Sequence, residues 1–148
     1  MIFVRVKTSN PSSGELQDMK LETNESVYEH MGKMCEGWGE DLMGKHGYSA
    51  VGAVVGATYP EQLGEMRAKL PHTFFLVPGY GAQGGGADDV KNAFDENGLG
   101  AIINSSRGIM CAWKKQGLTE DDFAVAARKE AERMRNEIVG CIGKIKLG

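Results

Sequence analysis

Four short apolar runs, each followed by a segment with helical signals, constrain the fold of this 148-residue chain more than any other feature. The runs occupy residues 2–6, 51–55, 74–77 and 101–103. Apart from Arg5 they are continuous rather than alternating, which favours strands buried on both faces, as in a parallel sheet. Four strands that alternate with helices predict parallel pairing, right-handed crossovers and therefore an α/β protein.

Capping signals place a helix after each run. Capping boxes open at Ser26 and at Thr58, acidic residues from Asp88 onward suit a first helical turn, and Thr119 opens the last and longest helix. We interpret the apolar residues that follow at helical spacing as core packing. In the last helix this line is Phe123, Ala127, Met134, Ile138 and Cys141.

Two architectures fit four such units: an open doubly wound sheet, or half of a (β/α)8 barrel, which needs about 250 residues when complete. The chain shows no linker, low-complexity stretch or charge block, so we expect a single domain over residues 1–148.

Composition argues against several other classes of protein. The net charge of −3 (17 Lys+Arg against 20 Asp+Glu) argues against nucleic-acid binding, and no apolar run approaches the length of a membrane span. Three scattered cysteines predict neither a disulfide framework nor a zinc site. With no sign of a signal peptide at the first residues, we expect a cytoplasmic protein.

Polar and glycine-rich loops follow all four predicted strands, at residues 8–14, 56–58, 78–86 and 104–108. In both architectures, ligands bind at the carboxyl ends of the strands, where these loops lie. The histidines, by contrast, fall within a helix or just before strands, so none is well placed for acid–base catalysis.

The third loop contains Gly79, Gly81 and Gly84 in a G-x-G-x-x-G pattern. A dinucleotide fingerprint would open its helix at the third glycine and place an acidic residue about 20 positions later, and this chain does neither. The loop is therefore either a flexible turn without a ligand or an anion cradle. In a cradle, backbone N–H groups and the amide of Gln83 would approach a phosphate.

The fourth loop supports the anion cradle. Ser105, Ser106 and Arg107 are hydrogen-bond donors at a strand end, and residues 109–115 are expected to form a short extra helix. (β/α)8 barrels frequently bind phosphate with the loops after strands seven and eight and the start of such a helix. The four strands would then be the fifth to eighth of a barrel. The alternative for Arg107 is a surface ion pair.

Together these loops resemble the phosphate-binding end of the orotidine 5′-phosphate decarboxylase family, particularly its longer bacterial branch. The residues concerned are 78–85 and 104–108, with 8–14 and 54–58 in matching order, so that the resemblance covers essentially the whole chain. It implies the second half, strands five to eight, of a (β/α)8 TIM barrel whose N-terminal half is absent. The family converts orotidylate to UMP and CO2, usually as a dimer, without metal or organic cofactor.

The resemblance also implies roles for individual residues. Ser9 would hydrogen-bond the pyrimidine with Asn10 beside it, Pro78 would line the pocket near the base, and Gln83 and Arg107 would hold the 5′-phosphate. The expected substrate-binding residues are Ser9, Asn10, Pro78, Gln83, Ser106 and Arg107.

One departure from the family pattern concerns the reacting centre. The family carries it on an Asp-x-Lys-x-x-Asp segment in the first half of the barrel. The two partial matches here, around Lys20 and Lys91, each lack the second aspartate and are expected to lie on the solvated surface. We therefore expect no catalytic residue in this chain and no turnover by the chain alone. Because a half barrel exposes two strand edges and an apolar interior, we expect it to associate with itself or with the missing half.

Two other functions stay open at this stage. Another phosphate-binding barrel enzyme, such as an isomerase or aldolase, would share the anion site but needs a base or Schiff-base lysine at a strand end, which we do not find. A half-barrel remnant without activity could instead act as a phosphate-ligand binder or as an assembly piece.

Overall fold

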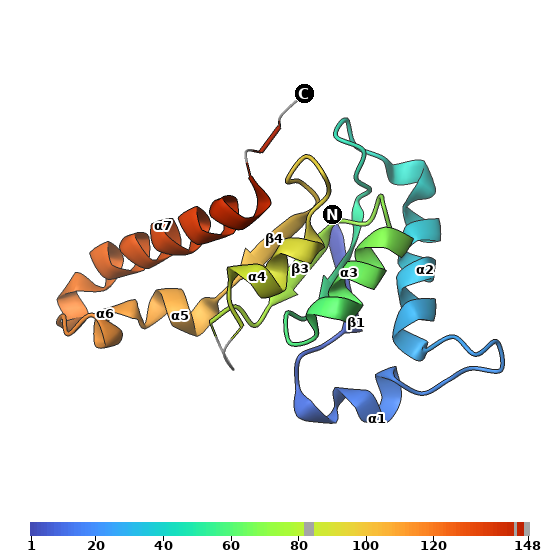
Figure 1. Cartoon of the computed structure of the whole chain (residues 1–148), viewed down its shortest axis with the longest axis horizontal. Coiled ribbons are helices and arrows are strands. Elements are labelled where there is room, and N and C mark those ends of the chain that lie inside the picture. Colours follow the sequence, from blue (N-terminus) through green and yellow to red (C-terminus); the bar gives the residue numbers. More distant parts are fainter. Residues whose placement is uncertain (82–84, 144, 147–148) are drawn as a thin grey trace.

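The computed structural model of the chain is built on one parallel sheet of four strands, in the order β1-β2-β3-β4 (Figure 1). It describes residues 1–81, 85–143 and 145–146. The strands are β1 (Ile2–Lys7), β2 (Val51–Val55), β3 (Phe75–Pro78) and β4 (Ala101–Asn104). All four follow the apolar runs of the sequence, which confirms the predicted α/β class and parallel pairing.

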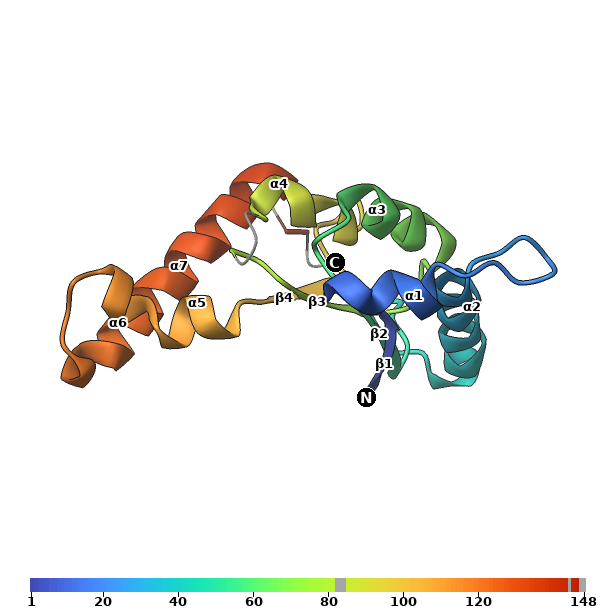
Figure 2. The same ribbon diagram turned by 90° about the horizontal axis from the view of Figure 1, so that it is seen from below.

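Helices fill the connections between the strands and follow the last strand, β4. They are α1 (Gly14–Gln17), α2 (Val27–Gly39), α3 (Pro60–Lys69), α4 (Ala87–Val90), α5 (Ser106–Met110), α6 (Ala112–Lys115) and α7 (Phe123–Ile142), with single 3-10 turns at 11–13, 40–42, 91–93 and 120–122. Figure 2 shows α3, α4 and α7 on one side of the sheet. None of the described helices is long and apolar enough to cross a membrane.

The capping predictions have mixed outcomes. The box at Ser26 is confirmed, because its hydroxyl accepts from the backbone N–H of Glu29, and the Glu29 carboxylate accepts from the N–H of Ser26 at 2.8 Å. The box at Thr58 is wrong. Helix α3 begins at Pro60, one residue later than a cap at Thr58 would place it. The fixed φ of proline suits the first position of a helix, where no N–H partner is needed. The Thr119 box is formed, but it caps the 3-10 turn that precedes α7.

The two faces of the sheet differ in exposure. Side chains on the helix-covered face, such as Val55 and Val77, are buried, and Leu63 and Met66 of α3 pack with them in the main core. The opposite face, which we call the inner face, leaves Ile102 more than half exposed. The sheet therefore has the one-sided cover of a barrel wall.

Helix α7 only partly follows its predicted apolar line. Met134 and Ile138 are buried, as expected, but Phe123 is 57% exposed and Cys141 is also exposed. The N-terminal part of α7 extends beyond the sheet to meet α5 and α6, so its first turn has no strand to pack on (Figure 1). Ala126 is buried there instead.

Candidate functional site

The carboxyl ends of all four strands meet along one rim of the sheet. The backbone N–H of Gly56 donates to the carbonyl of Lys7 at 2.8 Å, and the N–H of Ala57 donates to the carbonyl of Pro78 at 3.0 Å. Pro78 is in register with Asn104 on β4. The four predicted ligand loops therefore begin side by side, as the parallel topology requires.

The loop after β1 is organised by its own side chains. The Thr8 hydroxyl donates to Oδ1 of Asn10 at 2.6 Å, and Nδ2 of Asn10 donates to the Ser12 hydroxyl at 2.9 Å. The Thr8 backbone N–H donates to the side-chain oxygen of Gln17 at 3.0 Å, which ties the loop to α1. Asn10 is thus held at the exposed rim in a fixed orientation.

Ser9 and Pro78 lie where three loops converge. A Cβ at Gly56 would lie 3.0 Å from Cβ and from the backbone nitrogen of Ser9, so any larger residue would require the Ser9 loop to shift. A Cβ at Gly79 would meet Cβ of Ser9 at 3.9 Å and that of Ala57 at 3.7 Å. Pro78, which is half-buried, directly precedes Gly79. The structure thus brings the two predicted pyrimidine contacts, Ser9 and Pro78, into one region.

A buried tyrosine anchors the glycine-rich loop. Tyr80 is 4% exposed and its hydroxyl donates to Oε2 of Glu137 on α7 at 2.7 Å. Burial and the Glu137 carboxylate raise the pKa of Tyr80 to about 12, and the Tyr80 hydroxyl and Arg133 lower the pKa of Glu137. The Ser105 hydroxyl donates to the Tyr80 carbonyl at 2.8 Å, which joins the loops after β3 and β4.

Beyond this anchor, a hydrogen bond joins Gly81 and Gly85. Gly81 adopts φ +71°, a conformation that favours glycine, and its N–H donates to the carbonyl of Gly85 at 2.8 Å. The predicted phosphate ligand Gln83 lies outside the described residues.

The segment after β4 differs from its prediction. Helix α5 begins at Ser106 rather than at residue 109, so Ser106 and Arg107 are in its first turn, and α6 follows as a separate short helix. The Ser106 hydroxyl accepts from Nδ2 of Asn104 at 3.2 Å. Arg107 is exposed on the same rim as the glycine-rich loop, and no carboxylate of the described residues pairs with it. The described residues therefore do not support a surface ion pair for Arg107.

A buried lysine at the base of the first loop was missed by the sequence prediction. Lys7, at the end of β1, is 1% exposed, pairs with Asp18 at 2.5 Å, and lies 5.2 Å from the ring centroids of both Tyr28 and Tyr59. This pair closes the loop that carries Ser9 and Asn10.

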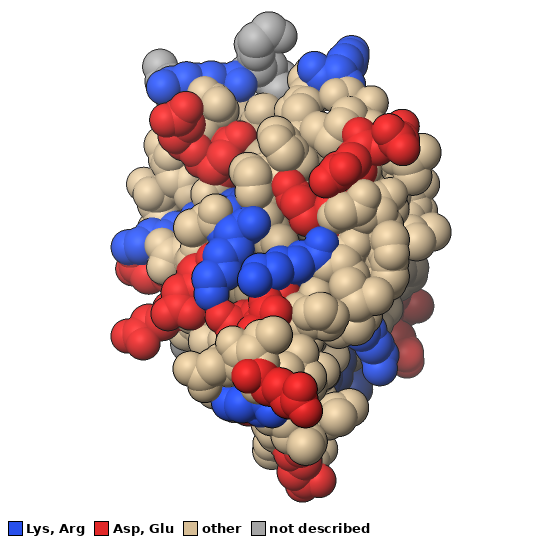
Figure 3. Space-filling model, turned by 90° about the vertical axis from the view of Figure 1, so that its right-hand side faces the viewer, with Lys and Arg blue, Asp and Glu red and all other residues tan. Residues whose placement is uncertain are grey.

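The two partial Asp-x-Lys matches lie on the surface, as expected. Lys20 is solvent-exposed and pairs with Glu29, and Lys91 pairs with Asp88. Figure 3 views the molecule from the α2 side, where acidic and basic side chains are interspersed. Among the residues described, no three His, Cys, Asp or Glu side chains are grouped so that they could hold a metal ion.

Fold and rim together define a class of protein: half of a (β/α)8 barrel, with its polar ligand loops gathered at the carboxyl ends of its strands. Solved structures agree. A putative orotidine-monophosphate-decarboxylase from Toxoplasma gondii matches with a TM-score of 0.73 and 30% identity, over 96% of this chain and 51% of that one. Leishmania donovani OMP decarboxylase matches with a TM-score of 0.67 and 32% identity, over 92% of this chain and 47% of that one.

Curated relatives of the chain carry the same name. Orotidine 5′-phosphate decarboxylase of Rhodopirellula baltica is 50% identical over 85% of this chain, and that of Clostridium tetani is 43% identical over 95%. The chain spans only 40% and 48% of these two relatives, and no family model matches it. The chain is thus similar, along nearly all its length, to a C-terminal half of orotidine 5′-phosphate decarboxylases, which confirms the resemblance predicted from its loops.

Proposed function

We propose that residues 1–148 form the phosphate- and pyrimidine-binding half-barrel domain of an orotidine 5′-phosphate decarboxylase. Joined by the N-terminal half, it would convert orotidylate to UMP and CO2. The observation that carries this proposal is the identity of 43–50% to relatives of that name over 85–95% of the chain. The rim supports it, because the loops that carry the resemblance lie side by side there.

In this proposal the rim binds the two ends of the nucleotide separately. Arg107, exposed and unpaired among the described residues, takes the 5′-phosphate with Gln83 and the backbone around Ser106. Ser9 and Pro78 contact the base, with Asn10 beside them. Binding energy from the distant phosphate can then organise the reacting centre. Contacts away from the reacting bond can be used to lower the free energy of the transition state.

Bond breaking belongs to polypeptide outside this chain. The Asp-x-Lys-x-x-Asp segment that the family resemblance implies is absent from the 148 residues, and Lys20 and Lys91 already have surface partners. The chain alone is therefore proposed to bind nucleotide without turnover. The reaction needs no metal or organic cofactor in this proposal, and the completed barrel would work in the cytoplasm as a homodimer.

Nucleotide binding provides the test. The chain is co-expressed with the part of the Rhodopirellula baltica relative that it does not match, and UMP titration by calorimetry compares wild type with Arg107→Ala. Loss of a charged phosphate contact worth about 1.5–3 kcal/mol should weaken UMP binding by about 10- to 150-fold. Arg128→Ala, which removes an exposed arginine of α7, is the matched control and should leave binding unchanged.

The same samples separate the alternatives. Equal affinity for UMP and ribose 5-phosphate would favour another phosphate-binding barrel, and no binding of either would favour a remnant without ligand. Orotidylate decarboxylation followed by the ultraviolet absorbance change should occur only in the co-expressed complex. Robust turnover by the chain alone would overturn the assignment of the chemistry to the other half.

A further inference from the structure

The inner face of the sheet is an apolar surface with one positive charge. Arg5, Val54, Leu76 and Ile102 form one row in the strand register, so their side chains point to the same side of the sheet. Phe3 lies in the adjacent row and is 37% exposed, while Ile102 is 54% exposed. In the described part of the chain, no helix covers these two side chains. Arg5 is also exposed, on the same edge strand as Phe3 and at the opposite edge of the sheet from Ile102.

Both edges of the same sheet are open. β1 pairs only with β2, and β4 only with β3, within the described residues. Parallel sheets are otherwise covered on both faces and closed or protected at their edges. The chain spans 40% and 48% of two curated relatives, and the part of each relative that it does not match is long enough to cover this face.

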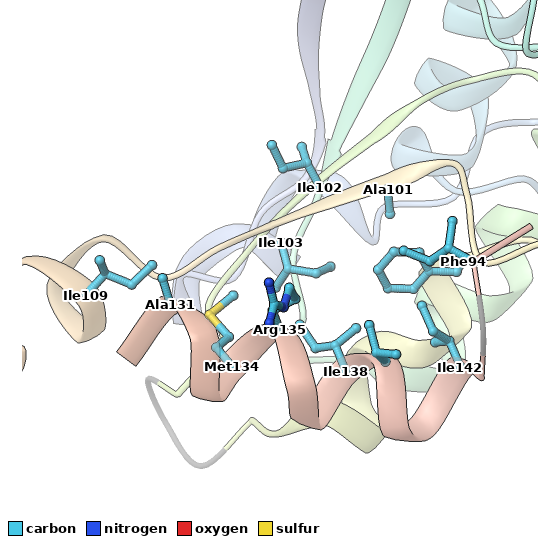
Figure 4. A pocket seen from close by; sticks show the side chains of 12 residues that line it. Phe94, Ala101, Ile102, Ile103, Ile109, Ala131, Met134, Arg135, Ile138 and Ile142 are labelled. Atoms are coloured by element: carbon cyan, nitrogen blue, oxygen red, sulfur yellow. The ribbon is translucent and has the colours of Figure 1, made fainter. Parts of the chain in front are cut away.

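The edge at β4 continues into an apolar groove against α7 (Figure 4). The groove has a volume of about 320 Å3, and Ile103, Met134 and Ile138 point into it. Its one charged lining residue is again an arginine, Arg135. A covering polypeptide must bury both the inner face and this groove. Both surfaces carry an arginine, and the described residues that line them include no carboxylate.

Covering the inner face removes Arg5 from water. A buried guanidinium is costly unless a carboxylate pairs with it, and no described carboxylate does so here. A second copy of this chain would not solve the problem. It would bring another Arg5 into the same enclosed interior together with the same apolar rows, which adds like-charge repulsion to two unpaired buried cations.

We infer that the inner face and open edges of this sheet bind a complementary βα polypeptide that carries a carboxylate opposite Arg5, and that this charge pair selects the complement over a second copy of the chain. A bidentate Arg–carboxylate pair has the directional geometry for such a choice. The inference rests on the proposed half-barrel role, but it does not depend on the identity of the substrate.

Co-expression and native mass spectrometry test this inference directly. The probe is the part of the Rhodopirellula baltica relative that this chain does not match, carrying an affinity tag. Wild-type chain should form a one-to-one complex with it. Arg5→Met should weaken that complex by about 30-fold or more, because it leaves the facing carboxylate buried without a partner. Arg5→Lys, which keeps the charge but not the planar fork, should fall between the two.

Controls keep the outcome decisive. Arg128→Met, at an exposed position of α7 outside the groove lining, should bind like wild type. Unchanged thermal unfolding of Arg5→Met should show that the chain itself still folds. A charge swap gives a further control. The chain carries Arg5→Glu, and single acidic residues of the probe are replaced by arginine one at a time. One of these replacements should restore binding to the Arg5→Glu chain. The inference is overturned if no complex forms, if Arg5→Met binds within twofold of wild type, or if the wild-type chain instead closes into a stable dimer.

Activity separates this inference from the proposed function. A complex that depends on Arg5 but does not bind UMP or decarboxylate orotidylate would refute the proposed function and leave the pairing intact. A complex that decarboxylates orotidylate and forms equally well with Arg5→Met would support the proposed function and refute the charge pair.

Discussion

The bond between Tyr80 and Glu137 should hold the glycine-rich loop to α7, and a double-mutant cycle can measure its strength. Tyr80→Phe removes the hydroxyl that donates to the carboxylate at 2.7 Å, and Glu137→Gln removes the charge of the acceptor. The two residues are 57 positions apart, so their coupling reports tertiary structure alone. Both substitutions keep the volume of the side chain nearly unchanged.

The expected coupling follows from the surroundings of the pair. A hydrogen bond to a charged group contributes about 1.5–3 kcal/mol when water is excluded. Tyr80 is buried, but the Glu137 side chain is 45% exposed and is also paired with Arg133, which screens and shares the interaction. We therefore expect a coupling free energy of about 1 kcal/mol, and a melting temperature of either single variant about 2–4 °C below wild type.

Urea unfolding of the four proteins at neutral pH gives the coupling free energy. The exposed Arg128–Glu132 pair of α7, four residues apart, serves as the reference cycle and should give about 0.3–0.5 kcal/mol. A Tyr80–Glu137 coupling of the same size or smaller would refute the view that this bond anchors the loop.

The pH dependence of the same cycle has a defined sign. Because the pKa of Glu137 is lowered in the folded state, its contribution is complete above the unfolded value of about 4.3 and is lost as the pH falls through the folded value. Tyr80 has a folded pKa raised to about 12, so its contribution is complete below about 10 and is lost as the pH rises from there toward 12. The coupling should therefore be constant between these limits.

Two further predictions concern the stability of the scaffold. Glu29 pairs with Lys69 and accepts from Ser26 in the capping box of α2, and these contacts lower the pKa of Glu29 to about 2. Glu29→Gln should therefore reduce the free energy of unfolding by about 1–2 kcal/mol at neutral pH. In urea titrations, this difference should shrink as the pH falls from about 4.5 toward 2. Arg67 is buried, donates to the carbonyls of Thr73 at 2.9 Å and Gly100 at 3.3 Å, and lies over the ring of Phe75. Arg67→Met should reduce the free energy of unfolding by about 3 kcal/mol or more, and Arg67→Lys should recover little of this loss. A loss below about 1 kcal/mol in Arg67→Met would contradict a structural role for these contacts.

Much of the fold follows from local sequence signals. Continuous apolar runs predicted all four strands, because strands buried in a parallel sheet need no alternation, and the capping box at Ser26 predicted the start of α2. Glycines within α2 weaken its local helical signal. At Gly32, however, a Cβ would clash with Cε of Met66 and lie 2.8 Å from Cδ1 of Leu70, so any larger residue would have to displace these two core side chains. Such a tertiary reason is invisible in the spacing of residues.

The position of the ligand loops was predicted better than the residues that hold them in place. Loop position could be derived, since parallel strands place all carboxyl ends together, but the start of α5 at Ser106 could not, because a serine followed by an arginine is compatible with a loop or a first turn. Lys7 was missed because a lysine at a strand end usually reaches solvent. Only its pairing with Asp18 and the two nearby tyrosine rings makes its burial possible.

Strand order that follows chain order also bears on how the molecule is made. Each strand pairs with the one synthesised just before it, so every new unit can add to an existing template without waiting for distant sequence. Loops that close only over neighbouring units cost little chain entropy, which favours fast, stepwise growth from the ribosome. The outer edge of β4 is then the growing edge of this four-stranded sheet, and units can be exchanged between relatives at the connections without changing the strand order.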